Sequence, residues 1–386
     1  MSRDGRALVD AVHAELLGVD PARIGDPRAV AAAVRREHPL LGEGEVASVA
    51  AAVAARAVGL GPLDPLLADP SVTEVMVNGP GPVWVERHGR LTVTDLVLGA
   101  GDLDLLVERI VAPLGLRADR RSPVADARLA DGSRANVVVA PVAVDGTCVT
   151  IRRFGARHLP LADLCPPGVA ELLTWAVGAR CNVVVSGGTG AGKTTLLNAL
   201  GARLPAGERL ITVEDTAELR LPGDHVVRLE ARPATADGLG QVGIRDLVRN
   251  ALRMRPDRIV VGEVRGPEAV DMLWAMNTGH EGSMTTCHAN SPADALRRLE
   301  LMVLGAGLDL PLHAVRDQLC AGLDLVVHIA RLSHGRRGVV AVAEVIDPPD
   351  PDERVRSLAD RHGVHALPAR PPRAVYAPPP SPGWCR

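Results

Sequence analysis

The sequence contains few aromatic residues, and this shortage narrows the functions that it can serve. Aromatic side chains make up 2% of the 386 residues, so the cores must be built from Val, Leu, Ile and Ala. So few rings also leave little to stack on the bases of single-stranded nucleic acid. The formal net charge of −3 does not provide the overall basic surface that attracts nucleic acid. We therefore expect no direct nucleic acid partner.

Signals for membrane insertion, export and disulfide bonds are absent as well. No run of about 18 or more uncharged apolar residues is present, and the residues from Met1 to Asp4 do not begin a signal peptide. The six cysteines form no C-x-x-C pair, which favours small core residues in a reducing compartment over disulfides or a zinc site. We expect a cytoplasmic protein that is at most peripheral to a membrane, through a partner.

Lysine is almost missing, and the one lysine lies in a glycine-rich loop. Of the 43 Lys and Arg residues, all but this lysine are arginine. A compact ammonium fits between phosphate oxygens, whereas a planar guanidinium does not. The stretch has the pattern G-x-x-x-x-G-K-[ST] and follows an apolar strand, so its amides and the next helix converge on phosphates. The loop consists of Gly187, Gly188, Thr189, Gly190, Ala191, Gly192, Lys193, Thr194 and Thr195. It predicts binding of a nucleoside triphosphate, with Lys193 on the β- and γ-phosphates and Thr194 on Mg²⁺.

The first part of the chain is predicted to contain a helical segment and an α+β domain. Residues 1–59 are Ala-rich, and Leu8, Val12 and Leu16 recur at helical spacing. Residues 60–154 alternate apolar and polar positions, which predicts a small sheet with one amphipathic helix. Its strands are expected at 74–77, 83–86, 134–139 and 148–152 and its helix at 103–114. Residues 155–168, with three prolines, are predicted to be a linker.

The second part is predicted to be an α/β domain over residues 169–347. Short Val- and Ile-rich strands alternate with helices, which indicates a mostly parallel sheet buried on both faces. Strands are expected at 181–186, 210–213, 258–261 and 283–287, helices at 169–177, from 194, at 244–253 and at 267–276, and a closing hairpin at 325–331 and 338–345. Residues 348–386 are rich in proline and lack periodicity, so we expect a disordered tail.

Acidic residues follow two of the predicted strands. Glu214, Asp215 and Glu218 follow the strand at 210–213, and Glu263 follows the strand at 258–261. The carboxyl ends of parallel strands face the ligand crevice, where a carboxylate can orient water and help to hold Mg²⁺. Gly262 stands where nucleotide-binding motifs usually have Asp. The alternative is that each acid is a solvated charge at a strand end.

Two histidines, His280 and His288, lie at the two ends of the strand expected at 283–287. No third residue lies at a suitable spacing to bind a metal together with these two histidines. An imidazole beside the terminal phosphate could instead report its loss, and the alternative is a pair of structural histidines.

Four blocks together resemble the bacterial type II/type IV secretion ATPase superfamily, also called secretion system protein E. They are 187–195, 211–221, 258–266 and 278–290, and they resemble its Walker A, Asp box, atypical Walker B and His box. Further matches at 60–63, 75–79, 126–134 and 151–154 resemble the tight-adherence (Tad/CpaF-like) pilus ATPases, including conjugal-transfer-associated members. The resemblance covers about residues 60 to 345.

The resemblance implies a RecA-like P-loop NTPase motor domain preceded by a PAS-like α+β domain, in a hexameric ring. It implies that Glu263 and Glu218 are the acids nearest the chemistry and that His280 and His288 are the His-box residues. It also implies an inner-membrane platform protein as partner. The tetracysteine insert of some members is absent, so no structural zinc is expected.

Ring motors of this class use a guanidinium from a neighbouring domain or subunit to stabilise the transferring phosphoryl group. Our candidates are Arg128 and Arg134, with Arg121 and Arg152 next, and each could instead be a surface arginine. We therefore expect a hexameric ATPase that powers pilus assembly, secretion or conjugal transfer. A RecA-like DNA translocation motor and a nucleotide-gated scaffold with little hydrolysis remain alternatives.

Overall fold

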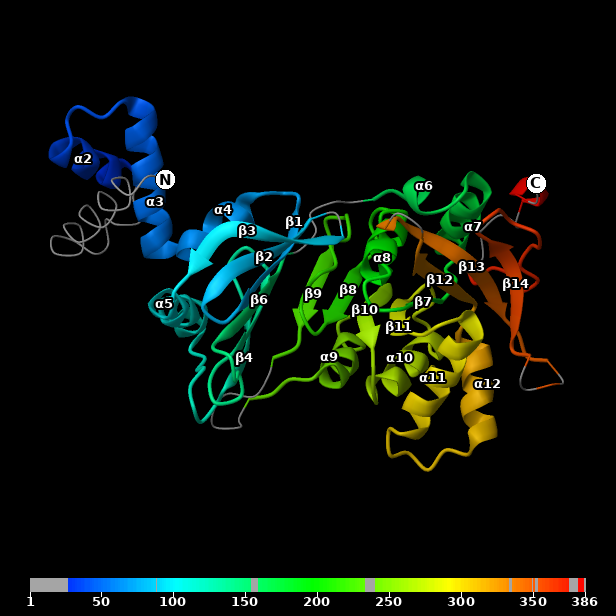
Figure 1. Ribbon diagram of the computed structural model, residues 1–386. Helices are drawn as coiled ribbons and strands as arrows, with labels where there is room; N and C mark the ends of the chain where they lie inside the picture. The colour runs from blue at the N-terminus through cyan, green and yellow to red at the C-terminus, as the bar shows by residue number, and fades with distance from the viewer. Residues whose placement is uncertain are drawn as a thin grey trace. The chain divides into compact units, whose positions relative to one another are not determined.

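The computed structural model describes residues 27–87, 89–153, 159–232, 240–332, 335–348, 350, 353–374 and 381–384. The chain divides into two compact units, Met1–Ala156 and Arg157–Arg386 (Figure 1). Each unit has its own sheet and its own core. The predicted helical spacing at Leu8, Val12 and Leu16 and the first part of the predicted linker lie outside the described residues.

The described part of the first unit begins with two helices, α2 (Pro27–Glu37) and α3 (Glu43–Val58). They pack on each other through small β-branched side chains, among them Val30, Val34 and Val53, all of which are fully buried. The shortage of aromatic residues explains this composition. Both helices lie within residues 1–59, the segment expected to be helical.

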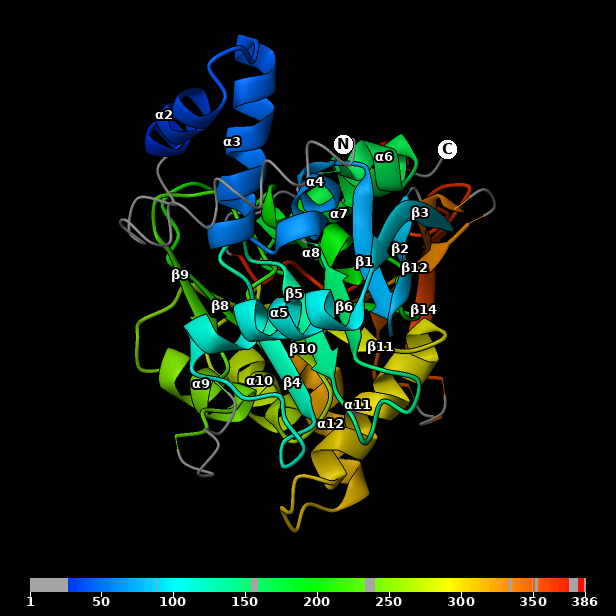
Figure 2. The same ribbon diagram turned by 60° about the vertical axis from the view of Figure 1, so that its left-hand side comes forward.

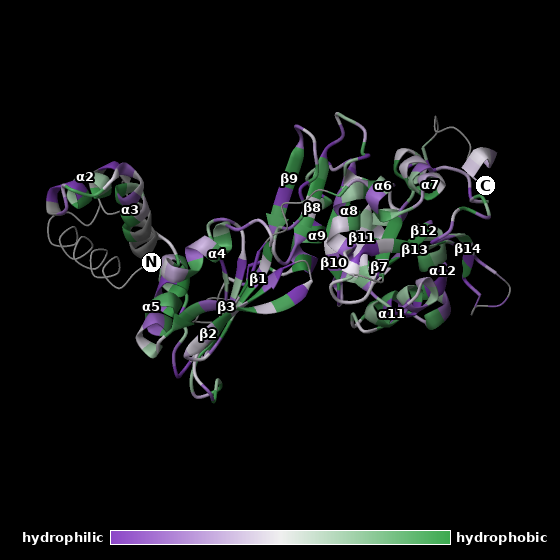
Figure 3. Cartoon of the chain, turned by 45° about the horizontal axis from the view of Figure 1, so that its top comes forward, coloured by the Kyte–Doolittle hydropathy of each residue, from purple (hydrophilic) through white to green (hydrophobic). Residues whose placement is uncertain are grey.

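A six-stranded antiparallel sheet forms the main layer of the first unit, in the order β3-β2-β1-β6-β5-β4. The strands are β1 (Val72–Asn78), β2 (Gly81–Arg87), β3 (Arg90–Leu98), β4 (Val124–Arg128), β5 (Arg134–Val138) and β6 (Cys148–Arg152). Helix α5 (Ala100–Val111) lies across it (Figure 2) and buries Leu103, Leu106 and Ile110 in the core. These residues recur at intervals of three and four, so they share one face of the helix, and α5 is striped in hydropathy (Figure 3).

The second unit is built on an eight-stranded sheet in the order β14-β13-β12-β7-β11-β10-β8-β9. The six strands from β12 to β9 in this order are parallel, and β13 and β14 continue the sheet antiparallel. The strands are β7 (Val183–Gly187), β8 (Leu210–Glu214), β9 (Val226–Glu230), β10 (Arg258–Val264), β11 (Met284–His288), β12 (Leu325–Arg331), β13 (Arg337–Val345) and β14 (Val355–Asp360). This arrangement confirms the predicted mixed α/β fold.

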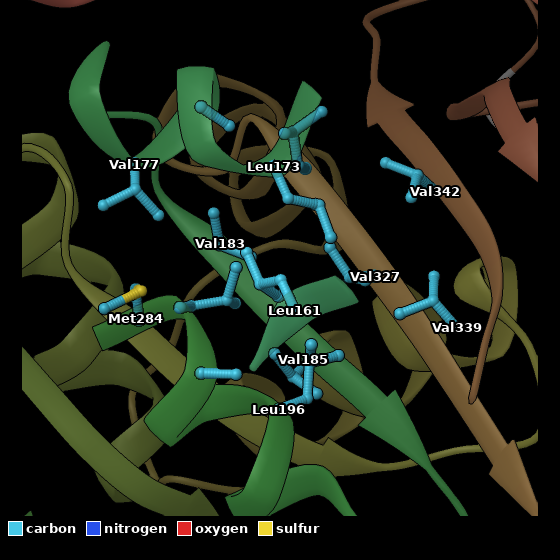
Figure 4. Close-up of a cluster of buried hydrophobic side chains, with 14 of the residues drawn as sticks. Leu161, Leu173, Val177, Val183, Val185, Leu196, Met284, Val327, Val339 and Val342 are labelled. Carbon is cyan, nitrogen blue, oxygen red and sulfur yellow. The ribbon is translucent and has the colours of Figure 1, made fainter. Parts of the chain in front are cut away.

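Helices cover both faces of this sheet, which is why its strands are continuously apolar. Successive residues of a strand point to opposite faces, so Val183 and Val185 enter one core while Val184 enters the other. The first core is completed by α6 (Leu161–Leu164), α7 (Pro167–Gly178) and α8 (Lys193–Gly201), and Figure 4 shows part of it. The second is completed by α9 (Ile244–Ala251), α10 (Glu268–Asn277), α11 (Pro292–Leu304) and α12 (Leu312–Gly322).

The prediction of a disordered tail over residues 348–386 is wrong for much of that segment. Strand β14 pairs with β13, and its Leu358 and Ala359 are fully buried. Farther on, Arg370 and Arg373 both form ion pairs with Asp324, a buried residue that precedes β12. The frequent prolines on either side of β14 hid a six-residue strand whose partner is supplied by tertiary structure.

Candidate functional site

The glycine-rich loop joins the end of β7 to the start of α8. Gly190 and Gly192 have φ angles of 68° and 102°, which residues with a Cβ rarely adopt. The first helical hydrogen bond of α8 runs from Leu196 N–H to the Gly192 carbonyl. The amides of residues 193–195 therefore have no acceptor within the helix, and they give the loop the anion-binding character of a helix N-terminus.

Lys193, the first residue of α8, folds its side chain back over the loop. Its Nζ lies 3.2 Å from the carbonyl oxygens of both Gly187 and Gly188, to which it donates hydrogen bonds. The side chain is only 9% exposed, and burial lowers its pKa, while the neighbouring Glu263 opposes that shift. The ammonium is therefore held at the loop rather than in solvent.

Glu263 lies near the end of β10, beside an irregularity in the pairing of β10 with β11 between Val261 and Val264. Irregularities of this kind redirect side chains and are frequent beside active sites. Its Oε1 lies 3.8 Å from Lys193 Nζ, and its Oε2 accepts a 2.9 Å hydrogen bond from Arg265 Nε. The structure thus brings two of the predicted site residues together.

His288, the last residue of β11, completes this cluster. Its Nε2 lies 3.0 Å from Glu263 Oε1 and 3.2 Å from Lys193 Nζ. Burial lowers the pKa of the imidazole, which favours its neutral form. A single ring nitrogen can donate to the carboxylate or accept from the ammonium, but not both. We define the Lys193–Glu263–His288 cluster by these three side chains.

His280, which we predicted to lie at the site, is not part of this cluster. β11 is parallel to β7, with Met284 opposite Val183 and His288 opposite Gly187. His280 precedes β11, so it lies near the amino-terminal ends of the parallel strands, whereas the glycine-rich loop lies at their carboxyl ends. There its carbonyl accepts a hydrogen bond from Ser283 Oγ. The two histidines lie at opposite ends of β11, so only His288 lies at the end of the strand beside the glycine-rich loop.

The acids that follow β8 occupy different environments. Glu214 is buried, and its Oε2 accepts hydrogen bonds from the backbone amides of Glu218 and Leu219, at 2.7 and 2.8 Å. Burial raises the pKa of Glu214 to about 7. Asp215 is exposed, with its Oδ2 3.7 Å from Arg265 Nη1. Glu218 is half-buried and enters this network through its backbone amide.

Three arginines at the site were missed by the sequence analysis. Arg265 contacts both Glu263 and Asp215. Arg331 ends β12 and Arg337 begins β13, and both approach glycines of the loop. Because arginine is so abundant in this sequence, its presence alone does not indicate a site. The one signal that could have identified these three is their position at or next to the end of a strand. Arg128, Arg134, Arg121 and Arg152 belong to the first unit, and their predicted role stays a prediction.

The oxygen groups at the loop fit a magnesium ion carried by a triphosphate. Mg²⁺ prefers hard oxygen ligands and keeps several waters, so it needs few protein groups. Within the described residues, Glu263 Oε1 is buried and accepts no hydrogen bond, although His288 lies close by. It is available as a ligand together with the Thr194 hydroxyl. The described part of the chain contains no group of three or more His, Cys, Asp and Glu residues able to hold a metal. Nor does any helix there have the length and apolar character to cross a membrane.

Comparisons with known proteins show which family this chain resembles. A family model described as "Type II/IV secretion system protein" matches residues 56–363. The putative conjugal transfer protein Rv3659c of Mycobacterium tuberculosis is 40% identical over 316 residues, which cover 79% of this chain and 89% of that protein. The conjugal transfer protein TrbB of Rhizobium radiobacter is 36% identical over 288 residues, or 72% of this chain and 84% of that one. The crystal structure of the pilus retraction motor PilT with bound ADP has a TM-score of 0.56 at 21% identity and covers 75% of this chain and 83% of that chain, a similarity of fold.

Proposed function

The chain belongs to the type II/IV secretion system protein family, and from this premise we propose that it is a Mg²⁺-dependent ATPase that drives pilus assembly, secretion or conjugal transfer. The observation that carries the proposal is the Lys193–Glu263–His288 cluster beside the glycine-rich loop. An ammonium, a carboxylate and a neutral imidazole meet where a terminal phosphate would lie. Such a set of groups can bind a phosphoryl group and prepare water to attack it.

Each residue of the cluster has a separate task in this proposal. Lys193 exchanges the carbonyl oxygens of Gly187 and Gly188 for oxygens of the nucleotide. Glu263 orients the attacking water and accepts its proton. His288 contacts both, so it holds Glu263 in place and responds when the terminal phosphate leaves. Thr194 would ligate Mg²⁺ and Glu263 would help to hold it through a water, and the ion would supply positive charge against the phosphate oxygens.

Arginines of the first unit are candidates for a contact with the nucleotide. Arg128 pairs with Arg134 across β4 and β5, and Arg134 pairs with Arg152 across β5 and β6. Like charges directly opposite each other repel, and Glu74, whose Oε1 lies 3.5 Å from Arg152 Nε, offsets part of this repulsion. We propose that these arginines contact the nucleotide of the same or a neighbouring subunit in a homohexamer.

The remaining features of the proposal are expectations for a member of this family. The second unit would be the RecA-like motor domain and the first a PAS-like domain. The protein would act in the cytoplasm, at the inner membrane, by moving a membrane-embedded platform protein. Relatives named for conjugal transfer make DNA-transfer machinery one candidate system.

The test is release of phosphate from MgATP by the purified full chain, with mass measured in solution with and without nucleotide. We expect steady turnover by an oligomer. Lys193→Ala should lose nucleotide binding, whereas Arg220→Ala, an exposed cation of the same unit, should keep it. A wild-type protein that fails to bind MgATP would overturn the proposal. A protein that binds MgATP without turnover would instead be a nucleotide-gated scaffold.

A further inference from the structure

The hairpin of β12 and β13 brings two arginines to the glycine-rich loop from the side opposite Glu263. In the sheet, β7 lies between β12 and β11, and β10 follows β11. Glu263 on β10 and His288 on β11 therefore border the loop on one side. Arg331 and Arg337, at the tip end of the β12–β13 hairpin, border it on the other.

Contacts at the loop glycines locate these arginines. A Cβ on Gly192 would lie 2.8 Å from Arg337 Cδ, and one on Gly190 would lie 3.4 Å from Arg331 Nη2. Arg337 Nη1 lies 3.5 Å from Thr195 Oγ1, in the first turn of α8. The guanidinium of Arg337 is therefore held at the end of the loop where the helix amides point out.

The two arginines are also direct cross-strand partners in the β12–β13 pairing. Their side chains consequently leave the same face of the hairpin, and two like charges in such a pair repel each other. Together with the contacts at Gly190 and Gly192, this pairing brings two cationic side chains to the same loop.

We infer that Arg337, assisted by Arg331, binds the phosphate nearest the ribose of the nucleotide, in the same subunit. The inference rests on the proposed function and extends it. The terminal phosphate must lie near Glu263 for water to attack it, so the rest of the phosphate chain extends across the loop toward β12 and β13. A guanidinium there contacts a group that ATP and ADP share, and it contributes to affinity for both.

The test compares binding of MgATP and MgADP by calorimetry to full-length wild type, Arg337→Gln and Arg331→Gln. Arg336→Gln is the matched control, because this exposed neighbour loses the same charge. Arg337→Gln should weaken both nucleotides by about tenfold to a hundredfold, the usual value of a charged hydrogen bond, with little change in their ratio. Arg331→Gln should have a smaller effect of the same kind, and Arg336→Gln should stay within about twofold of wild type.

Two outcomes would overturn the inference and leave the proposed function intact. Either Arg337→Gln binds both nucleotides like wild type while Lys193→Ala binds neither, or it loses affinity for ATP alone. Failure of the wild type to bind MgATP would remove the proposed function itself. Arg337→Lys keeps the charge and the aliphatic stem, so it controls for folding and should retain part of the affinity.

Discussion

A Cβ atom on Gly262 would lie 2.9 Å from Cγ of Glu214, a buried side chain of the neighbouring strand. β10 and β8 are parallel neighbours, with Val261 opposite Val213, so the residues that follow these positions meet. Glycine at 262 is therefore the steric counterpart of Glu214. This explains why the aspartate usual in nucleotide-binding motifs is missing without any loss of Glu263.

Replacing Gly262 with alanine should destabilise the protein by about 1–3 kcal/mol, the usual cost of forcing an extra group into a packed interior. Glu214 cannot easily move aside because the amides of Glu218 and Leu219 hold its carboxylate. Urea unfolding measures the change. The same substitution in a Glu214→Ala background should cost much less, and an equal cost in both backgrounds would show that the two residues are not coupled.

Replacing Glu214 with glutamine should change how stability depends on pH. Burial raises the pKa of this carboxyl from 4.5 to about 7. Between these values the folded state binds a proton that the unfolded state releases, so the unfolding free energy contributed by Glu214 falls as pH rises. Glutamine can still accept both amide hydrogen bonds and lacks this pH dependence.

The variant should therefore gain stability relative to wild type between pH 4.5 and pH 8, by roughly 3 kcal/mol at about 1.4 kcal/mol for each unit of pKa shift. Urea unfolding at pH 4.5 and pH 8 gives the two differences. Glu171→Gln, at an exposed position of α7, controls for loss of one carboxylate. An identical difference at both pH values for Glu214→Gln would contradict the raised pKa.

Glu263→Gln should bind MgATP within a few fold of wild type and lose turnover by about 10²–10⁴, the usual contribution of a positioned general base. The amide keeps the shape of the side chain but cannot accept a proton. Calorimetry and phosphate release separate the two effects. Turnover close to wild type would exclude Glu263 as the base and direct attention to Glu218.

The two histidines should differ in their effect on hydrolysis. His288→Ala removes a side chain 3.0 Å from Glu263 Oε1, so turnover should fall while the fold is kept. His280→Ala alters the end of the sheet that lies away from the glycine-rich loop of the same subunit, and it should leave turnover near wild type. Phosphate release by both variants at equal protein concentration makes the comparison. Equal losses of turnover in both variants would contradict this difference and would show that His280 also contributes to hydrolysis.

Leu358→Ala should cost about 2–5 kcal/mol, because this leucine is fully buried in the core of the second unit. Ser357→Ala, at an exposed position of the same strand, is the matched control and should be nearly neutral. Thermal or urea unfolding measures both. If neither substitution mattered, the segment after residue 347 would be the disordered tail that the sequence predicted.

The elements that could be predicted are those whose signal is local. β7, the loop and α8 form one continuous stretch, so the strand, the glycines and Lys193 could be identified together. The apolar strands β8, β10 and β11 were predicted because both of their faces are buried. In the first unit β3 and β4 were not predicted. In the second unit β9 and β14 were missed, since β9 is only half-buried and β14 is flanked by proline-rich chain.

The order of residues along the chain determined the phosphate-binding loop, because main-chain conformation there depends on glycines a few positions apart. It also determined that Glu263 lies near the end of a strand and that His288 lies at the end of one. Tertiary structure alone decided which strand ends meet. Ser186 Oγ lies 2.9 Å from His328 Nδ1 across 142 residues, and the same alignment of β12 beside β7 delivers Arg331 and Arg337 to the loop. Sheet order is set by the burial of whole strands against helices on both faces, a collective quantity that no short stretch of sequence contains.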